Sequence, residues 1–71
     1  MQNKWVIPSW LKVGTNVVVT RGKKVPLGTK GVVVDVSSSG NGAYAYVRPD
    51  GAPDSDPIFW KKVRVVNLDP V

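Results

Sequence analysis

Alternating valines predict the first strand of this chain. Val17 and Val19 fall on one face of an extended segment, while Val18 and Thr20 fall on the other. This spacing is typical of a strand with one buried face, and it predicts a strand that ends near Arg21. A connection over residues 22–30 follows, because two glycines and a proline interrupt the pattern there.

A second valine-rich segment, residues 31–37, predicts the next strand. Four of its residues are valine, so alternation alone leaves open which of them face inward. A bulge or a strong twist would bury Val33 and Val36 together. The polar run 37–42, which contains Asn-Gly, predicts a turn after this strand.

The tyrosine-bearing segment that follows predicts a third strand with two possible orientations. In one, Ala45 and Val47 fill the interior, and Tyr44, Tyr46 and Arg48 form a stripe on the outer face. The other register turns the tyrosines inward. Because an arginine suits a tight interior poorly, we expect the tyrosines outside.

The remaining strands are expected to be short. After the third strand, residues 43–48, an acidic loop leads to an apolar fourth strand at 58–60. A two-lysine connection, which one 3₁₀ turn would fit, then leads to a last strand at 63–67. Residues 68–71 are expected to form a fraying tail.

The N-terminal residues 1–12 are expected to form an arm that packs on the main domain, residues 13–67. Trp5 and Trp10 in this arm either cap an open end of a small core or contact a partner. No stretch resembles a helix, because β-branched residues dominate and glycine and proline recur every few positions. We therefore expect an all-β fold, a small and highly curved five-stranded barrel.

The spacing of valines and glycines in residues 17–36 resembles a known motif. The KOW motif, found in SH3-like barrel domains of ribosomal proteins and transcription elongation factors, is similar to Val17-x-Val19-x-x-Gly22 and Gly28-x-x-Gly31-x-Val33-x-x-Val36. The chain departs from the family by an apparent two-residue insertion before Gly28. Residues 59–66 also look like the last strands of such barrels. The resemblance implies a KOW-type SH3-like barrel whose first loop meets RNA or a partner protein.

The charge of the chain favours anionic partners. Ten Lys and Arg against five Asp and no Glu leave a net charge of +5 over 71 residues. The sequence has no His and no Cys, so the usual proton shuttle and the commonest transition-metal ligands are missing. We therefore expect no enzymatic activity, no metal and no cofactor.

Candidate site residues lie on the basic loop and on the aromatic strand face. Loop cations neutralise phosphates, and exposed tyrosines offer surfaces on which bases stack. Phe59 and Trp60 point to opposite faces of the expected fourth strand, so we expect one in the core and Trp60 beside the lysines at the surface. The candidate nucleic-acid-binding residues are Arg21, Gly22, Lys23, Lys24, Lys30, Tyr44, Tyr46, Arg48, Trp60, Lys61 and Lys62, with Gly28 added by the resemblance.

Two hypotheses follow for the function. The first is a non-enzymatic nucleic-acid-binding module for RNA or single strands rather than duplex DNA, because no recognition helix is expected. The alternative is a protein–protein interaction module of SH3-like type, in which Trp5, Trp10 or Trp60 and the loops of the barrel engage a peptide or a larger complex.

The sequence also suggests where the protein acts. Residues 1–12 lack the apolar run of a signal peptide, and no segment approaches the ~20 apolar residues that span a membrane. We expect a cytoplasmic protein without membrane contact. We expect a monomer, with self-association through a strand edge or an exposed tryptophan as the alternative.

Overall fold

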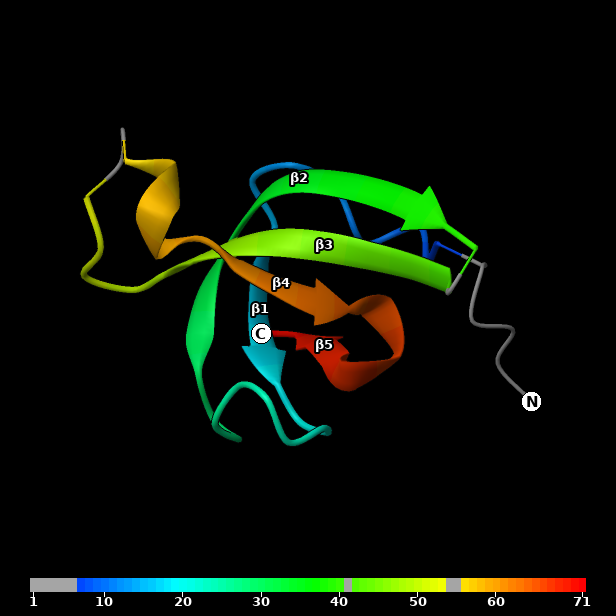
Figure 1. The fold of residues 1–71 in the computed structure, drawn as a ribbon, viewed down its shortest axis with the longest axis horizontal. Coiled ribbons are helices and arrows are strands. Elements are labelled where there is room, and N and C mark those ends of the chain that lie inside the picture. Colours follow the sequence, from blue (N-terminus) through cyan, green and yellow to red (C-terminus); the bar gives the residue numbers. More distant parts are fainter. Residues whose placement is uncertain (1–6, 41, 54–55) are drawn as a thin grey trace.

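The computed structural model describes residues 7–40, 42–53 and 56–71. They form one antiparallel sheet of five strands in the order β4-β3-β2-β1-β5, drawn in Figure 1. The strands are β1 (Asn16–Val19), β2 (Lys30–Ser39), β3 (Gly42–Pro49), β4 (Lys61–Arg64) and β5 (Leu68–Pro70), and the 3₁₀ helices are η1 (Pro57–Phe59) and η2 (Val65–Asn67). The expected all-β class is confirmed.

The sheet is curved but not closed. In Figure 1 β2 rises along the left side of the molecule and bends over its top, while β1 and β5 lie below β3. Among the described residues, no strand pairing joins β4 to β5, so these strands are the two edges of the sheet. Five strands were expected and are found, whereas the pairing does not close them into a barrel. None of the described helices is long and apolar enough to cross a membrane.

The core lies inside this curve and follows the alternation of the strands. Val17 and Val19 are buried on β1, and Ala45 and Val47 are buried on β3, both as expected. Successive side chains of a strand point to opposite faces, which leaves Tyr44 and its outward neighbours on β3 only half-buried. The buried core consists of Leu11, Val17, Val19, Val33, Ala43, Ala45, Val47, Val63, Val65 and Leu68.

A bulge in β2 resolves the ambiguity of its valines. The register with β3 shifts between Val33 and Asp35, so one extra residue is accommodated on β2 and the alternation restarts. Val33 is fully buried, and Val36, three positions later, also packs against the core. The expected bulge is therefore confirmed, with Val33 fully buried and Val36 partly buried against the core.

The expected fourth strand at 58–60 is wrong. Residues 57–59 form η1, in which Pro57 occupies the first turn and the Asp56 carboxylate accepts a hydrogen bond of 3.1 Å from the Ile58 amide. This local capping overrides the β propensity of the apolar triplet. Ile58 is 79% exposed and Phe59 is 45% exposed, so neither Phe59 nor the half-buried Trp60 fills the core.

The last third of the chain also differs from the expectation. The two lysines that were expected in a connection belong to β4. The strand expected at 63–67 ends at Arg64, and η2 follows from Val65. Leu68 pairs with Val19 in β5 and is 2% exposed. The fraying tail at 68–71 is therefore wrong, because this segment completes the sheet and the core.

The N-terminal arm is described only from residue 7 onward. Leu11 is buried and Trp10 packs against the core. The Thr15 hydroxyl donates a hydrogen bond of 2.8 Å to the Trp10 carbonyl, which ties this segment to the start of β1. The expectation for Trp5 lies outside the described residues.

Gly31, one of the glycines in the motif-like segment, packs closely against β3. A Cβ at this position would overlap the Arg48 carbonyl oxygen and lie 2.7 Å from a Val47 methyl group. We predict that Gly31→Ala lowers the free energy of unfolding by about 1–3 kcal/mol, measured by urea denaturation. Gly40→Ala is the control, because nothing lies within 4 Å of the added Cβ. Equal stability of the two variants would contradict the close approach.

Candidate nucleic-acid interface

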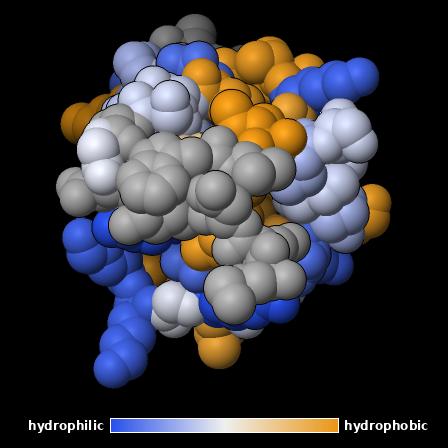
Figure 2. Space-filling view, turned by 90° about the vertical axis from the view of Figure 1, so that its right-hand side faces the viewer, coloured by the Kyte–Doolittle hydropathy of each residue, from blue (hydrophilic) through white to orange (hydrophobic). Residues whose placement is uncertain are grey.

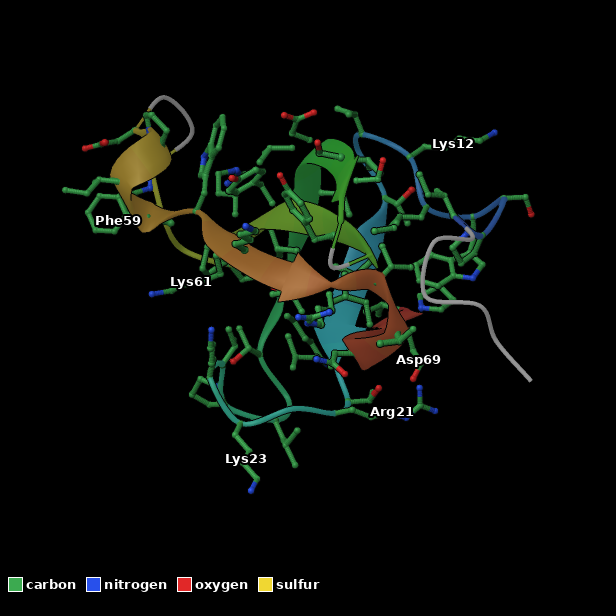
Figure 3. The ribbon with its side chains drawn as sticks, turned by 45° about the vertical axis from the view of Figure 1, so that its right-hand side comes forward. Lys12, Arg21, Lys23, Phe59, Lys61 and Asp69 are labelled. Carbon is green, nitrogen blue, oxygen red and sulfur yellow. The ribbon has the colours of Figure 1, made fainter. Side chains whose placement is uncertain are left out.

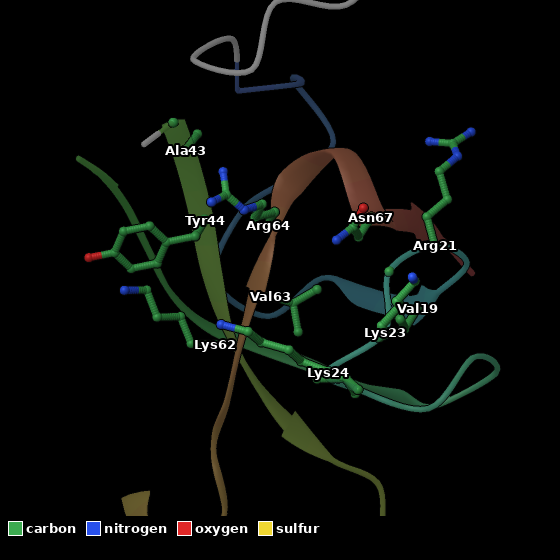
Figure 4. Close-up of a pocket in the computed structure, with 13 residues that line it drawn as sticks. Val19, Arg21, Lys23, Lys24, Ala43, Tyr44, Lys62, Val63, Arg64 and Asn67 are labelled. Carbon is green, nitrogen blue, oxygen red and sulfur yellow. The ribbon is translucent and has the colours of Figure 1, made fainter. Parts of the chain in front are cut away.

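A pocket of about 390 Å³ opens between the first loop, residues 20–29, and the β3–β4 edge of the sheet. Figure 4 shows the loop on one side and Tyr44 with β4 on the other. Its walls come from Val19 of β1, residues 21–25 of the loop, 42–44 of β3, 62–64 of β4 and Asn67 of η2. The fold thus brings together segments that are about 20 residues apart in sequence.

The pocket is strongly cationic. Five of its 13 lining residues are Lys or Arg, and none is Asp or Glu. With a low-dielectric protein wall behind them, charges of one sign reinforce one another and attract anions. The five cations are Arg21, Lys23, Lys24, Lys62 and Arg64.

β4 presents its charges because of its register with β3. Tyr46 lies opposite Lys62, and Tyr44 lies opposite Arg64. Residues opposite one another in an antiparallel pair point to the same face, so both cations lie on the outer face with the tyrosines. Lys62 Nζ lies 4.2 Å from the centroid of the Tyr44 ring, a cation–π contact.

Three aromatic side chains continue from the pocket along the sheet. The rings of Tyr44 and Tyr46 are 5.7 Å apart and nearly perpendicular, at 85°. The rings of Tyr46 and Trp60 are 6.5 Å apart and tilted by 50°. Tyr44 lines the pocket, whereas the other two rings lie beyond it. These rings support one another and hold Tyr44 in place at the pocket wall.

The start of the first loop is fixed to η2. The Thr20 amide donates a 2.9 Å hydrogen bond to the Asn67 carbonyl, and the Arg21 guanidinium donates one of 2.8 Å to the Val66 carbonyl. Gly22 has φ +96° and packs so closely that an added Cβ would lie 2.8 Å from Asn67 Nδ2. The positive φ favours glycine here, and any larger residue would also have to displace the end of the Asn67 side chain. These contacts fix the loop side of the pocket against η2.

Several of the sequence-predicted site residues lie away from the pocket. Lys30 is at the start of β2, opposite Val18, and Arg48 donates a hydrogen bond of 3.3 Å to the Ala52 carbonyl near the other end of β3. Lys61 does not line the pocket either. Figure 3 shows the Lys61 side chain pointing away from the molecule, as does that of Lys23, which nevertheless belongs to the lining. Gly28 is also outside the lining.

Two polar lining residues were not anticipated, Arg64 and Asn67. Arg64 shares a face with Lys62 once the strand is placed at 61–64, so the i, i+2 spacing was the available signal. Asn67 is brought to the pocket by η2, which turns the chain between β4 and β5. No local sequence pattern predicts that turn.

Exposed apolar side chains are scattered rather than gathered at the pocket. Val13, Leu27, Ile58 and Val71 are each more than 60% exposed, and they come from separate segments. On the face drawn in Figure 2, hydrophobic surface lies in several patches that hydrophilic residues separate. Across the described ranges, no group of three or more His, Cys, Asp or Glu is placed to hold a metal ion.

Comparison with protein-family models, curated proteins and solved structures gave no match for this chain.

Proposed function

We propose that this protein is a non-enzymatic module that binds single-stranded nucleic acid, RNA above all, through the cationic pocket. The observation that carries the proposal is that five of the 13 residues lining the pocket are Lys or Arg, that none is Asp or Glu, and that a tyrosine forms part of its wall. Phosphates are the anions that such a surface suits, because each neutralised phosphate also releases condensed counterions.

We also propose that the fold is an SH3-like barrel of KOW type. The motif-like segment, residues 17–36, spans β1, the first loop and β2, and its loop forms one side of the pocket. The return of the last strand to pair with the first also supports this assignment. In KOW-type domains the first loop commonly meets RNA or a partner protein, and here that loop supplies Arg21, Lys23 and Lys24 to the pocket.

A single strand is the favoured form of the ligand. The helices among the described residues are two 3₁₀ turns of three residues each, and neither is long enough to read a major groove. A groove between a loop and a sheet edge suits a flexible backbone better than a rigid duplex.

Titration of tryptophan emission with an RNA oligomer at two salt concentrations tests the proposal. If three to five cations each neutralise a phosphate, the affinity falls roughly 20- to 130-fold between about 50 mM and 200 mM salt. Absence of binding at the lower concentration would refute it.

The protein-interaction alternative predicts a different result. A partner held by apolar or hydrogen-bonded contacts would be captured equally well after nuclease treatment and after replacement of Lys23 and Lys24. Nucleic-acid binding predicts that both treatments release the captured material.

A further inference from the structure

The Tyr44–Lys62 pair determines which part of a strand the pocket can bind. The ammonium group of Lys62 lies over the Tyr44 ring, 4.2 Å from its centroid. The same ring meets Tyr46 edge to face. A base that stacked on the face carrying Lys62 would have to displace the ammonium group and lose the cation–π contact.

Positive charge, in contrast, reaches the pocket from two sides. Lys23 and Lys24 come from the first loop, and Lys62 and Arg64 come from β4. Figure 4 shows Lys24 extending from the loop toward Lys62 and Tyr44. Lysine binds phosphate as a point charge and needs no particular base beside it. The arrangement therefore suits a phosphodiester backbone passing between the loop and the strand.

We infer that the pocket recognises the sugar–phosphate backbone of a single strand without stacking a base on Tyr44, and that Tyr44 is a positioning residue that holds the Lys62 ammonium group toward the phosphates. This inference rests on the proposed function and narrows it. Binding then depends on the backbone alone and is independent of base sequence.

The direct test compares two RNA strands on the unchanged protein. One is oligouridine of about ten nucleotides, within the usual range of single-strand site sizes, and the other is a strand of equal length built from abasic ribose units. By fluorescence anisotropy at low salt, we expect the two dissociation constants to agree within about threefold. Stacking would make the abasic strand weaker by roughly 5- to 150-fold for each base lost.

Substitutions of Tyr44 and Lys62 distinguish a positioning role of Tyr44 from the stacking of bases on its ring. Tyr44→Phe keeps a ring beneath the ammonium group and should bind both strands as the unchanged protein does. Tyr44→Leu should weaken both strands by the same factor. Lys62→Gln should reduce the slope of log affinity against log salt by about 0.7 for both strands. Circular dichroism confirms that each variant is folded.

One result would refute the backbone inference alone, and a different result would refute the proposed function. If the abasic strand binds much more weakly, or if Tyr44→Leu affects only the strand that carries bases, the backbone inference is overturned while nucleic-acid binding stands. If neither strand binds the unchanged protein at low salt, the proposed function itself fails.

Discussion

Reversing two charges of the pocket, Lys24→Glu together with Lys62→Glu, should weaken RNA binding by at least about 100-fold at low salt. Each lysine is expected to make one charge-assisted phosphate contact, and the loss of one such contact costs roughly tenfold in affinity. The glutamates add repulsion to this loss. Both side chains line the pocket and both residues are exposed, so the fold should survive the change. Fluorescence anisotropy with a labelled oligouridine measures the effect.

The matched control reverses two exposed lysines that do not line the pocket, Lys12 and Lys61. Both double variants lower the net charge from +5 to +1, so any difference between them comes from position. We expect the control to lose only the long-range attraction, which salt screens. Equal losses in the two variants would mean that binding follows net charge and that the pocket is not the site.

The first three strands could be predicted because their information is local. Valine alternation in β1 and alanine–valine alternation in β3 place Val17, Val19, Ala45 and Val47 correctly in the core. The Asn-Gly turn indicated the β2–β3 hairpin, although β2 extends to Ser39 and β3 begins at Gly42. A period of two is visible in any window of four to eight residues.

The last third could not be predicted in the same way, because two other effects dominate there. Local turn chemistry at Asp56-Pro57 converts an apolar triplet with strand propensity into η1. Leu68 becomes a core residue only because it pairs with Val19, 49 positions earlier in the chain. A pairing between residues so far apart in the sequence is not visible in the local pattern. The last residues of the chain were therefore interpreted as a tail.

The residues of the candidate site were also predicted only where the information is local. The loop cations and Tyr44 were identified from composition and alternation, and the structure brings them to one pocket. Arg64 was missed because Lys61 and Lys62 were expected in a connection, so that Lys62 and Arg64 were not placed on one strand face. Lys61 and Lys30 were included on charge alone, yet the strand positions that they occupy leave them outside the pocket.

The closing strand carries the largest expected effect on stability. Leu68 is 2% exposed and belongs to the core, and β5 is held to β1 by a hydrogen bond of 3.0 Å from the Val71 amide to the Asn16 carbonyl. The Thr20 hydroxyl adds a 2.7 Å hydrogen bond to the Asp69 carboxylate. These contacts make the last four residues part of the folded unit rather than an appendage.

We therefore predict that Leu68→Ala lowers the free energy of unfolding by about 2–5 kcal/mol, since it removes buried methyl groups and leaves a cavity. A domain of this size has only about 4–10 kcal/mol in total, so the midpoint of thermal unfolding should fall by at least ~10 °C. Circular dichroism during heating and in urea measures both quantities. Val71→Ala, at a side chain that is 70% exposed, should change stability by less than ~0.5 kcal/mol. If Leu68→Ala unfolds at the same temperature as the unchanged protein, the C-terminal segment frays in solution and the sheet has four strands, not five.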